Sequence, residues 1–234
     1  MNTQDHMNTQ DQVRILSISG SLRKASFSTG ILRTLARKAA PSMLIDVMTL
    51  EEIPFYNEDL DRSPGLPAIA KLKRGVEESD GILIATPEYN HGIPGVLKNA
   101  LDWASRPAFQ SCFKNKPVSI ISSSLAFTGG VRAQYQLRET LIAMQAHLVI
   151  SPELVIGGVH TKFSDKTPAD ARAASCWSLR SAGRIACSCT GPPPGPLSSV
   201  CEYNDETGLS FIMDSLEKLR EEILARRALM VAHS

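Results

Sequence analysis

The sequence predicts an α/β domain built on a doubly wound, five-stranded parallel sheet with helices on both faces. Three observations support this prediction. Short apolar runs alternate along residues 13–156 with stretches that repeat apolar residues at helical spacing. One run, residues 81–85, is apolar throughout, as in a strand buried on both faces of a parallel sheet. The chain of 234 residues is long enough for one large domain.

The expected elements follow in regular order, and each has its own signal. Pro41 marks the break before the second strand, and Gly95 and Val131 begin helices that follow loops. The helix at 131–146 is expected to turn Leu137, Leu141, Ile142 and Met144 inward. The last helix is expected to be capped by Asp205 or Thr207, with Phe211, Ile212, Leu216, Leu219, Ile223 and Leu224 inward. The expected strands are 14–19, 43–50, 81–85, 117–124 and 147–156 (interrupted at Pro152), and the expected helices are 31–39, 66–79, 95–105, 131–146 and 205 onward.

Four segments are expected along the chain. Residues 1–12 are polar and form a disordered tail without the apolar core of a signal peptide. Residues 13–164 form the main domain, and residues 204–234 return to it as its last helix. Residues 165–203 show neither the alternation of a strand nor the helical spacing of apolar residues. They are expected to form an irregular insertion rich in cysteine and proline.

Composition excludes several classes of partner. A net charge of +1 gives no electrostatic basis for binding nucleic acid, and no apolar run is long enough for a membrane span. Five cysteines without a signal peptide indicate free thiols and a cytoplasmic location. Four of these cysteines fall in the insertion at spacings unlike those of zinc or iron–sulfur sites, so no metal is expected: Cys176, Cys187, Cys189 and Cys201.

Three loops at strand ends carry the chemistry. Residues 19–28 combine serines with Arg23 before a helix, which suits a phosphate, although the same serines could simply cap the helix. Residues 86–92 offer a rigid proline, an aromatic ring and an amide. Residues 122–130 offer hydroxyls and two glycines. In a doubly wound sheet these loops converge at the switch point, where a flat heteroaromatic with a phosphate tail would fit.

The same stretches carry a family resemblance over roughly residues 13–163. GSLRKASFS, TPEYNHGIPGVLKNALDW and KPVSIISSS with its later GG resemble the NAD(P)H-dependent FMN reductases, flavodoxin-like proteins that include quinone, chromate and azo-dye reductases. The resemblance implies a flavodoxin-like fold, FMN as cofactor, NADPH or NADH as reductant and a small-molecule electron acceptor. It also implies a homodimer or homotetramer with the flavin near the subunit contact.

Family positions transfer to this chain residue by residue. The resemblance places the FMN phosphate on Ser21, Arg23, Ser26 and Ser28. The family usually has asparagine at position 28, so the shorter serine predicts weaker FMN retention. The insertion at 165–203 has no counterpart in the family. The complete set of expected cofactor-binding residues is Ser21, Leu22, Arg23, Lys24, Ala25, Ser26, Phe27, Ser28, Pro87, Glu88, Tyr89, Asn90 and Ser123.

The expected reaction is centred on the flavin, so no residue is expected to be catalytic. Hydride would pass from the nicotinamide to FMN and onward to the acceptor in a ping-pong scheme, with backbone amides of residues 88–90 bonding the ring. Arg132 and Tyr135 are candidates for the pocket or a subunit contact, and Glu153 for a contact across subunits. His91 is a minor candidate for meeting the nicotinamide. Two alternatives remain: a flavodoxin-type electron carrier, which the net charge disfavours, or a non-enzymatic protein in which residues 165–203 prevent the last helix from docking.

Overall fold

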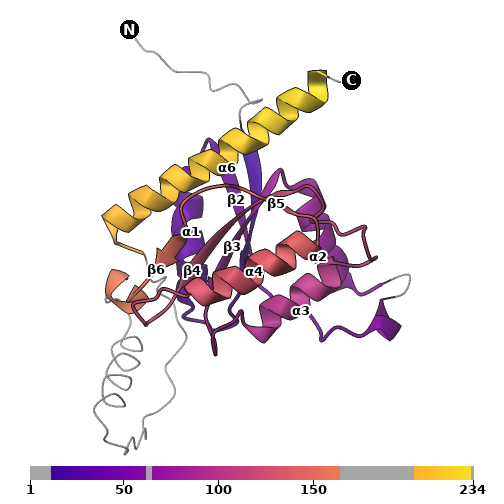
Figure 1. The fold of residues 1–234 in the computed structure, drawn as a ribbon, viewed down its shortest axis with the longest axis horizontal. Helices are drawn as coiled ribbons and strands as arrows, with labels where there is room; N and C mark the ends of the chain where they lie inside the picture. Colours follow the sequence, from indigo (N-terminus) through magenta and orange to yellow (C-terminus); the bar gives the residue numbers. More distant parts are fainter. Residues whose placement is uncertain (1–11, 62–64, 164–202, 233–234) are drawn as a thin grey trace, which may run out of the picture.

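The computed structural model describes residues 12–61, 65–163 and 203–232 and has a parallel sheet at its centre (Figure 1). The strand order is β2-β1-β3-β4-β5, with β6 paired to β4 beside β5, and every pairing is parallel. This order confirms the predicted doubly wound, flavodoxin-like sheet. The strands are β1 (Val13–Ser19), β2 (Met43–Met48), β3 (Gly81–Pro87), β4 (Pro117–Ser123), β5 (His147–Leu148) and β6 (Leu154–Ile156).

Helices cover both faces of the sheet. Apolar side chains of α1 and α6 build one core against the sheet, and those of α2, α3 and α4 build the other. Burial of these two apolar faces is the main term that stabilises such a layered fold. The helices are α1 (Phe27–Ala39), α2 (Pro67–Glu78), α3 (Gly95–Ala104), α4 (Val131–Ala143) and α6 (Glu206–Ala232), with short 3-10 turns at η2 (Glu58–Leu60) and η3 (Val159–Lys162).

The fifth strand position is shared by two short strands. β5 pairs with the start of β4 and β6 with its end, so the expected interruption at Pro152 is confirmed. Proline has no N–H for the ladder, and Ile150, two residues before it, is 96 % exposed. β6 thus reaches the same sheet edge as the loop that follows β4.

The last helix docks on the sheet, as expected for residues 204–234, and the alternative in which residues 165–203 prevent its docking is contradicted. Ile212, Leu216, Leu219 and Ile223 are buried at helical spacing, and α6 contacts β4 and β6. Asp205 caps the helix as expected, because its Oδ1 accepts the N–H of Gly208 at 3.1 Å.

Two expected core residues are exposed instead. Phe211 is 45 % exposed and Ile142 is 63 % exposed. Each directly adjoins a buried residue of the inward stripe, and one residue along a helix turns the side chain by about 100°. Both therefore lie beside the stripe rather than in it.

The ends of the domain extend slightly beyond the expected limits. Gln12 donates to the carbonyl of Pro41 and accepts from Arg227, so it is attached to the domain. Tyr203, expected in the insertion, is 3 % exposed and bridges antiparallel to Phe163. The expectations for residues 1–11 and for the four cysteines of the insertion lie outside the described residues.

Among the described residues, no helix is long and apolar enough to cross a bilayer, and no group of three His, Cys, Asp or Glu side chains could hold a metal ion. The described cysteine, Cys112, is a free thiol. Burial is the largest cause that raises the pKa of this thiol, the nearby Glu77 is the next, and the resulting pKa is about 11.

Candidate functional site

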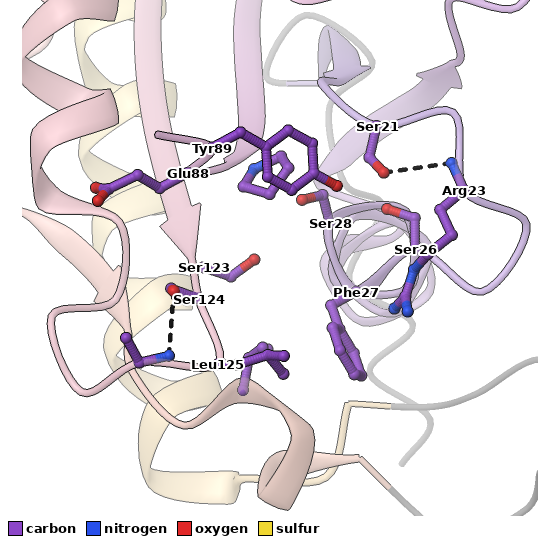
Figure 2. Close-up of a pocket in the computed structure, with 13 residues that line it drawn as sticks. Ser21, Arg23, Ser26, Phe27, Ser28, Glu88, Tyr89, Ser123, Ser124 and Leu125 are labelled. Atoms are coloured by element: carbon purple, nitrogen blue, oxygen red, sulfur yellow. Dashed lines mark hydrogen bonds between the residues drawn. The ribbon is translucent and has the colours of Figure 1, made fainter. Parts of the chain in front are cut away.

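A cavity of about 290 Å³ opens at the carboxyl ends of β1, β3 and β4 (Figure 2). This is the point where the strand order reverses, between β1 and β3, and it is where doubly wound sheets bind their ligands. The loop after β1 contributes Ser21, Arg23, Ser26, Phe27 and Ser28, the loop after β3 contributes Pro87, Glu88 and Tyr89, and the remaining lining comes from Ser123, Ser124, Leu125, Ala126 and Val159.

One side of the cavity is lined by serine hydroxyls at the start of α1. Ser21 Oγ accepts the N–H of Arg23, and Ser26 Oγ, as the helix cap, accepts the N–H of Thr29, both at 3.3 Å. A hydroxyl that accepts in this way is held in place and still has its own O–H to donate. Together with the positive end of the α1 dipole, these donors suit an anion such as phosphate.

Two of the hydroxyls in the first loop point elsewhere. Ser19 Oγ and Thr29 Oγ1 hydrogen bond to each other at 2.8 Å in the buried interior. Their pairing joins the end of β1 to the first turn of α1. They therefore support the loop, and the cavity is left to Ser21, Ser26 and Ser28.

Arg23 supplies the positive charge on this side. Its guanidinium lies over the Phe27 ring, 5.0 Å from the centroid, and donates to the carbonyl of Ala25. Stacking on the ring holds the cation at the rim of the cavity, beside Ser26 (Figure 2). An anion bound at the serines would lie within reach of this charge.

The opposite wall is the turn after β3. Tyr89 N–H donates to the carbonyl of Gly92 at 2.9 Å, and Gly92 N–H returns the bond at 3.0 Å. Asn90 and His91 occupy the two turn positions with φ of 49° and 67°, as a tight hairpin turn requires. The Tyr89 ring extends from this turn across the cavity toward the serines (Figure 2), whereas Asn90 and His91 are exposed and do not line it.

This turn corrects one expectation about the backbone. Because the Tyr89 N–H is bonded within the turn, it cannot also bond a ring in the cavity. Of the three amides expected to bond the ring, that of Tyr89 is therefore engaged within the turn. The Glu88 side chain is directed away from the serine side and accepts backbone N–H groups of α4 (Figure 2).

The third wall of the cavity is the loop after β4, and its position depends on two glycine pairs, Gly129–Gly130 and Gly157–Gly158, that pack together. Gly129 has a φ of +61°, and a Cβ there would lie 2.9 Å from the nitrogen of Gly157. A Cβ on Gly157 would lie 2.4 Å from the carbonyl oxygen of Phe127. Only glycine permits this approach. It brings the segment after β6 against the loop after β4, and Val159 thereby reaches the cavity.

The structure brings most of the expected residues together and leaves four outside. Leu22, Lys24, Ala25 and Asn90 belong to the right loops but do not line the cavity. Sequence reasoning missed Ser124, Leu125, Ala126 and Val159 as lining residues. The first three lie in a loop already selected, and the Gly157–Gly158 pair was the available signal for Val159.

The fold and the cavity define a flavodoxin-like α/β protein whose site has one side lined by serine hydroxyls and Arg23 and another side lined by apolar side chains. The sequence profile of the family described as NADPH-dependent FMN reductase matches residues 13–161. The chain therefore belongs to this family of oxidoreductases, which use FMN and NAD(P)H.

Relatives agree with this assignment. An NAD(P)H-dependent FMN reductase of Pseudomonas aeruginosa is 40% identical over 153 residues, which cover 65% of this chain and 82% of the relative. A quinone reductase of Escherichia coli K12 is 38% identical over 159 residues, covering 67% and 84%. Among solved structures, the flavoenzyme NAD(P)H:(acceptor) oxidoreductase FerB of Paracoccus denitrificans aligns with a TM-score of 0.67 and 26% identity, over 90% of this chain and 97% of that one.

Proposed function

We propose that this protein binds FMN in the cavity and transfers electrons from NADPH or NADH to a small acceptor such as a quinone. The observation that carries the proposal is that the serine hydroxyls and Arg23 at the start of α1 lie opposite the apolar side chains of the loops after β3 and β4, at the switch point of the sheet. Relatives named as FMN reductase and quinone reductase support the choice of reductant and acceptor class.

The serine side would hold the phosphate of FMN. Ser21 and Ser26 keep O–H donors available, and Ser28 lies in the first turn of α1, where helix N–H groups need acceptors. Charge-assisted bonds to a phosphate are stronger than bonds between neutral groups, and Arg23 adds its charge at the rim. These groups are aligned by their own hydrogen bonds before any ligand binds.

The ring side would hold the flavin. Pro87 and Tyr89 form one wall, and Leu125 and Ala126 form the other, so a planar apolar ring meets apolar surface on both sides. FMN, when bound, supplies the redox chemistry by accepting hydride from the nicotinamide and passing electrons to the acceptor. The role of the protein is to orient the ring, leave one part of it open to both substrates and donate backbone N–H groups toward it.

An anaerobic absorption spectrum tests the proposal. Purified protein is incubated with excess FMN, desalted and scanned, and NADPH is then added without air. We expect a retained flavin band that bleaches completely. Absence of a retained band would refute FMN binding, and a band that NADPH leaves unchanged would refute the reductase activity.

The order of the reaction and the identity of the acceptor need steady-state rates. We propose a ping-pong scheme, in which nicotinamide and acceptor use the same open part of the cavity in turn. Initial rates measured against NADPH at several fixed quinone concentrations should give parallel double-reciprocal lines. Intersecting lines would refute the scheme. Flavin, azo dye and chromate can be compared as acceptors in the same assay, and NADH as reductant.

We also propose that the protein forms a homodimer or homotetramer. Tyr135 and Ile142 lie seven residues apart on one face of α4 and are 58 % and 63 % exposed, and Ile150 is 96 % exposed between β5 and β6. Light scattering during gel filtration should give a mass at least twice 25.4 kDa. A mass equal to one chain would refute this proposal.

A further inference from the structure

The first turn of α4 has no cap from its own segment. Its N-cap residue is Gly130, which has no side chain, and no acidic residue lies in the first turn. The first N–H groups of a helix need acceptors from elsewhere. Glu88, the residue that follows β3, supplies one, because its Oε2 accepts the N–H of Arg132 at 3.0 Å and that of Ala133 at 3.2 Å.

The backbone at Gly130 makes this contact possible. Its φ is +88°, and a Cβ there would lie 3.1 Å from Ser122 Cβ and 3.5 Å from Glu88 Cβ. The end of β3, the end of β4 and the start of α4 therefore meet closely at this glycine. The Glu88 carboxylate also puts a negative charge at the positive end of the α4 dipole, which is the favourable arrangement.

A second bond attaches the same turn to α4. Gln136 Oε1 accepts the N–H of Ile93 at 2.7 Å, about one helical turn beyond the bonds made by Glu88. Between these two attachments lies the Tyr89–Gly92 turn, closed by its own pair of backbone bonds. The segment that forms one wall of the cavity is thus held at both ends by one helix.

α4 is in turn fixed to the cavity wall formed by residues 123–126, which follow Ser122 of β4. Gln134 is completely buried, and its side-chain amide donates to Ser122 Oγ at 3.0 Å and to the carbonyl of Leu154 at 2.8 Å. Ser122 precedes the Ser123–Ala126 wall directly. The chain of contacts therefore runs from the turn after β3, through α4, to the loop after β4.

We propose that Glu88 is a positioning residue that fixes the spacing of the two ring-side walls through α4 before the cofactor binds. The proposal deepens the proposed function, since the width of this cavity matters for a planar ring. The carboxylate acts through the helix and the turn, and it does not need to touch the ligand. Removing it should loosen the turn as well as the helix.

The test uses the full-length protein and three variants. Glu88→Ala removes the acceptor, Glu88→Gln keeps an oxygen but removes the charge, and Glu139→Gln neutralises an exposed carboxylate on the same helix as a control. Hydrogen exchange is measured residue by residue without cofactor, and FMN affinity is measured by fluorescence titration.

We expect Glu88→Ala to accelerate amide exchange about tenfold at Arg132 and Ala133, and also at Tyr89 and Gly92. The FMN dissociation constant should rise about tenfold, equivalent to about 1.4 kcal/mol. Glu88→Gln should lie between Glu88→Ala and the wild type, and Glu139→Gln should match the wild type in both measurements.

The two readouts separate failure of this proposal from failure of the proposed function. Faster exchange confined to Arg132 and Ala133, with unchanged FMN affinity, would show a simple helix cap and overturn the proposal. If wild-type protein binds no FMN, the proposed function fails, and unchanged exchange at Tyr89 and Gly92 still overturns the positioning role. If Glu88→Ala does not fold, the same comparisons are made with Glu88→Gln.

Discussion

Substitution of Asp205 tests how the last helix is held to the domain. Its Oδ1 accepts the N–H of Gly208, and its Oδ2 pairs with Lys162 and accepts the hydroxyl of Tyr203 at 3.3 Å. One carboxylate thus caps α6 and ties its start to η3, which carries the cavity residue Val159. The Asp205 side chain is 19% exposed, so its ion pair is only partly screened by water.

The cost of losing this side chain can be worked out from its two roles. Replacing an N-cap aspartate by alanine costs about 1 kcal/mol. Loss of the ion pair with Lys162 adds up to about 1 kcal/mol. Asp205→Ala should therefore lower the free energy of unfolding by about 2 kcal/mol and the melting temperature by roughly 4–8 °C for a domain of this size. Asp205→Asn keeps a good cap and should lose about half as much.

Thermal and urea unfolding at several pH values provide the assay. The hydrogen bond from Lys162 is the largest cause that lowers the pKa of Asp205, followed by the N–H of Gly208. A lowered pKa gives stability that is present above the unfolded value of about 3.9 and is lost as pH falls through the folded pKa. The gap between wild type and Asp205→Asn should hold from pH 7 to pH 5 and narrow below about pH 4.

Two results would refute this reasoning about Asp205. If Asp205→Asn is as unstable as Asp205→Ala, the cap contributes nothing. If both variants match the wild type at pH 7, α6 is held by its apolar face alone.

Three further predictions concern single side chains. Ser28→Asn should tighten FMN binding about threefold or more, measured by fluorescence titration, because the longer asparagine side chain offers two N–H donors where serine offers one O–H; an unchanged or weaker affinity would contradict the role given to position 28. Cys112 should react with iodoacetamide at pH 8 about a hundredfold more slowly than an ordinary thiol, because its pKa is raised from 9.0 to about 11. The rate is measured by peptide mass spectrometry, and rapid labelling in the folded protein would contradict the burial of this thiol. Trp103→Phe keeps a buried aromatic ring but loses the second ring of the indole and the 2.9 Å bond from its N–H to the carbonyl of Pro54. It should cost at least about 1–2 kcal/mol in urea unfolding, and an unchanged midpoint would contradict the contribution of this side chain.

The sheet could be predicted because its signals are local. The uninterrupted apolar run of β3 and the helical spacing in α1 each depend on neighbouring residues, and burial follows from them. The first loop could also be predicted, because serines and an arginine directly before a helix place hydrogen-bond donors and a positive charge at its N-terminus. The strand order does not follow from these local features, and the family resemblance implied it only through the flavodoxin-like fold.

What could not be predicted depends on contacts between distant residues. Glu88 lies more than forty residues before the helix it caps. Nothing in the sequence of residues 87–90 indicates that its carboxylate points away from the cavity. The packing of Gly129 against Gly157 likewise joins two glycine pairs that look like separate turns in the sequence. Val159 enters the cavity only as a result of that packing.

The pairing of Phe163 with Tyr203 has a consequence for how the chain tolerates change. Asn204 N–H also bonds to the carbonyl of Lys162 at 2.8 Å, so the chain leaves and re-enters the domain at one place. The domain thus fixes the distance between these two ends. The entropic cost of closing a connection between two fixed ends grows only slowly with its length. This junction is therefore a point at which additional residues can enter the chain at a small entropic cost.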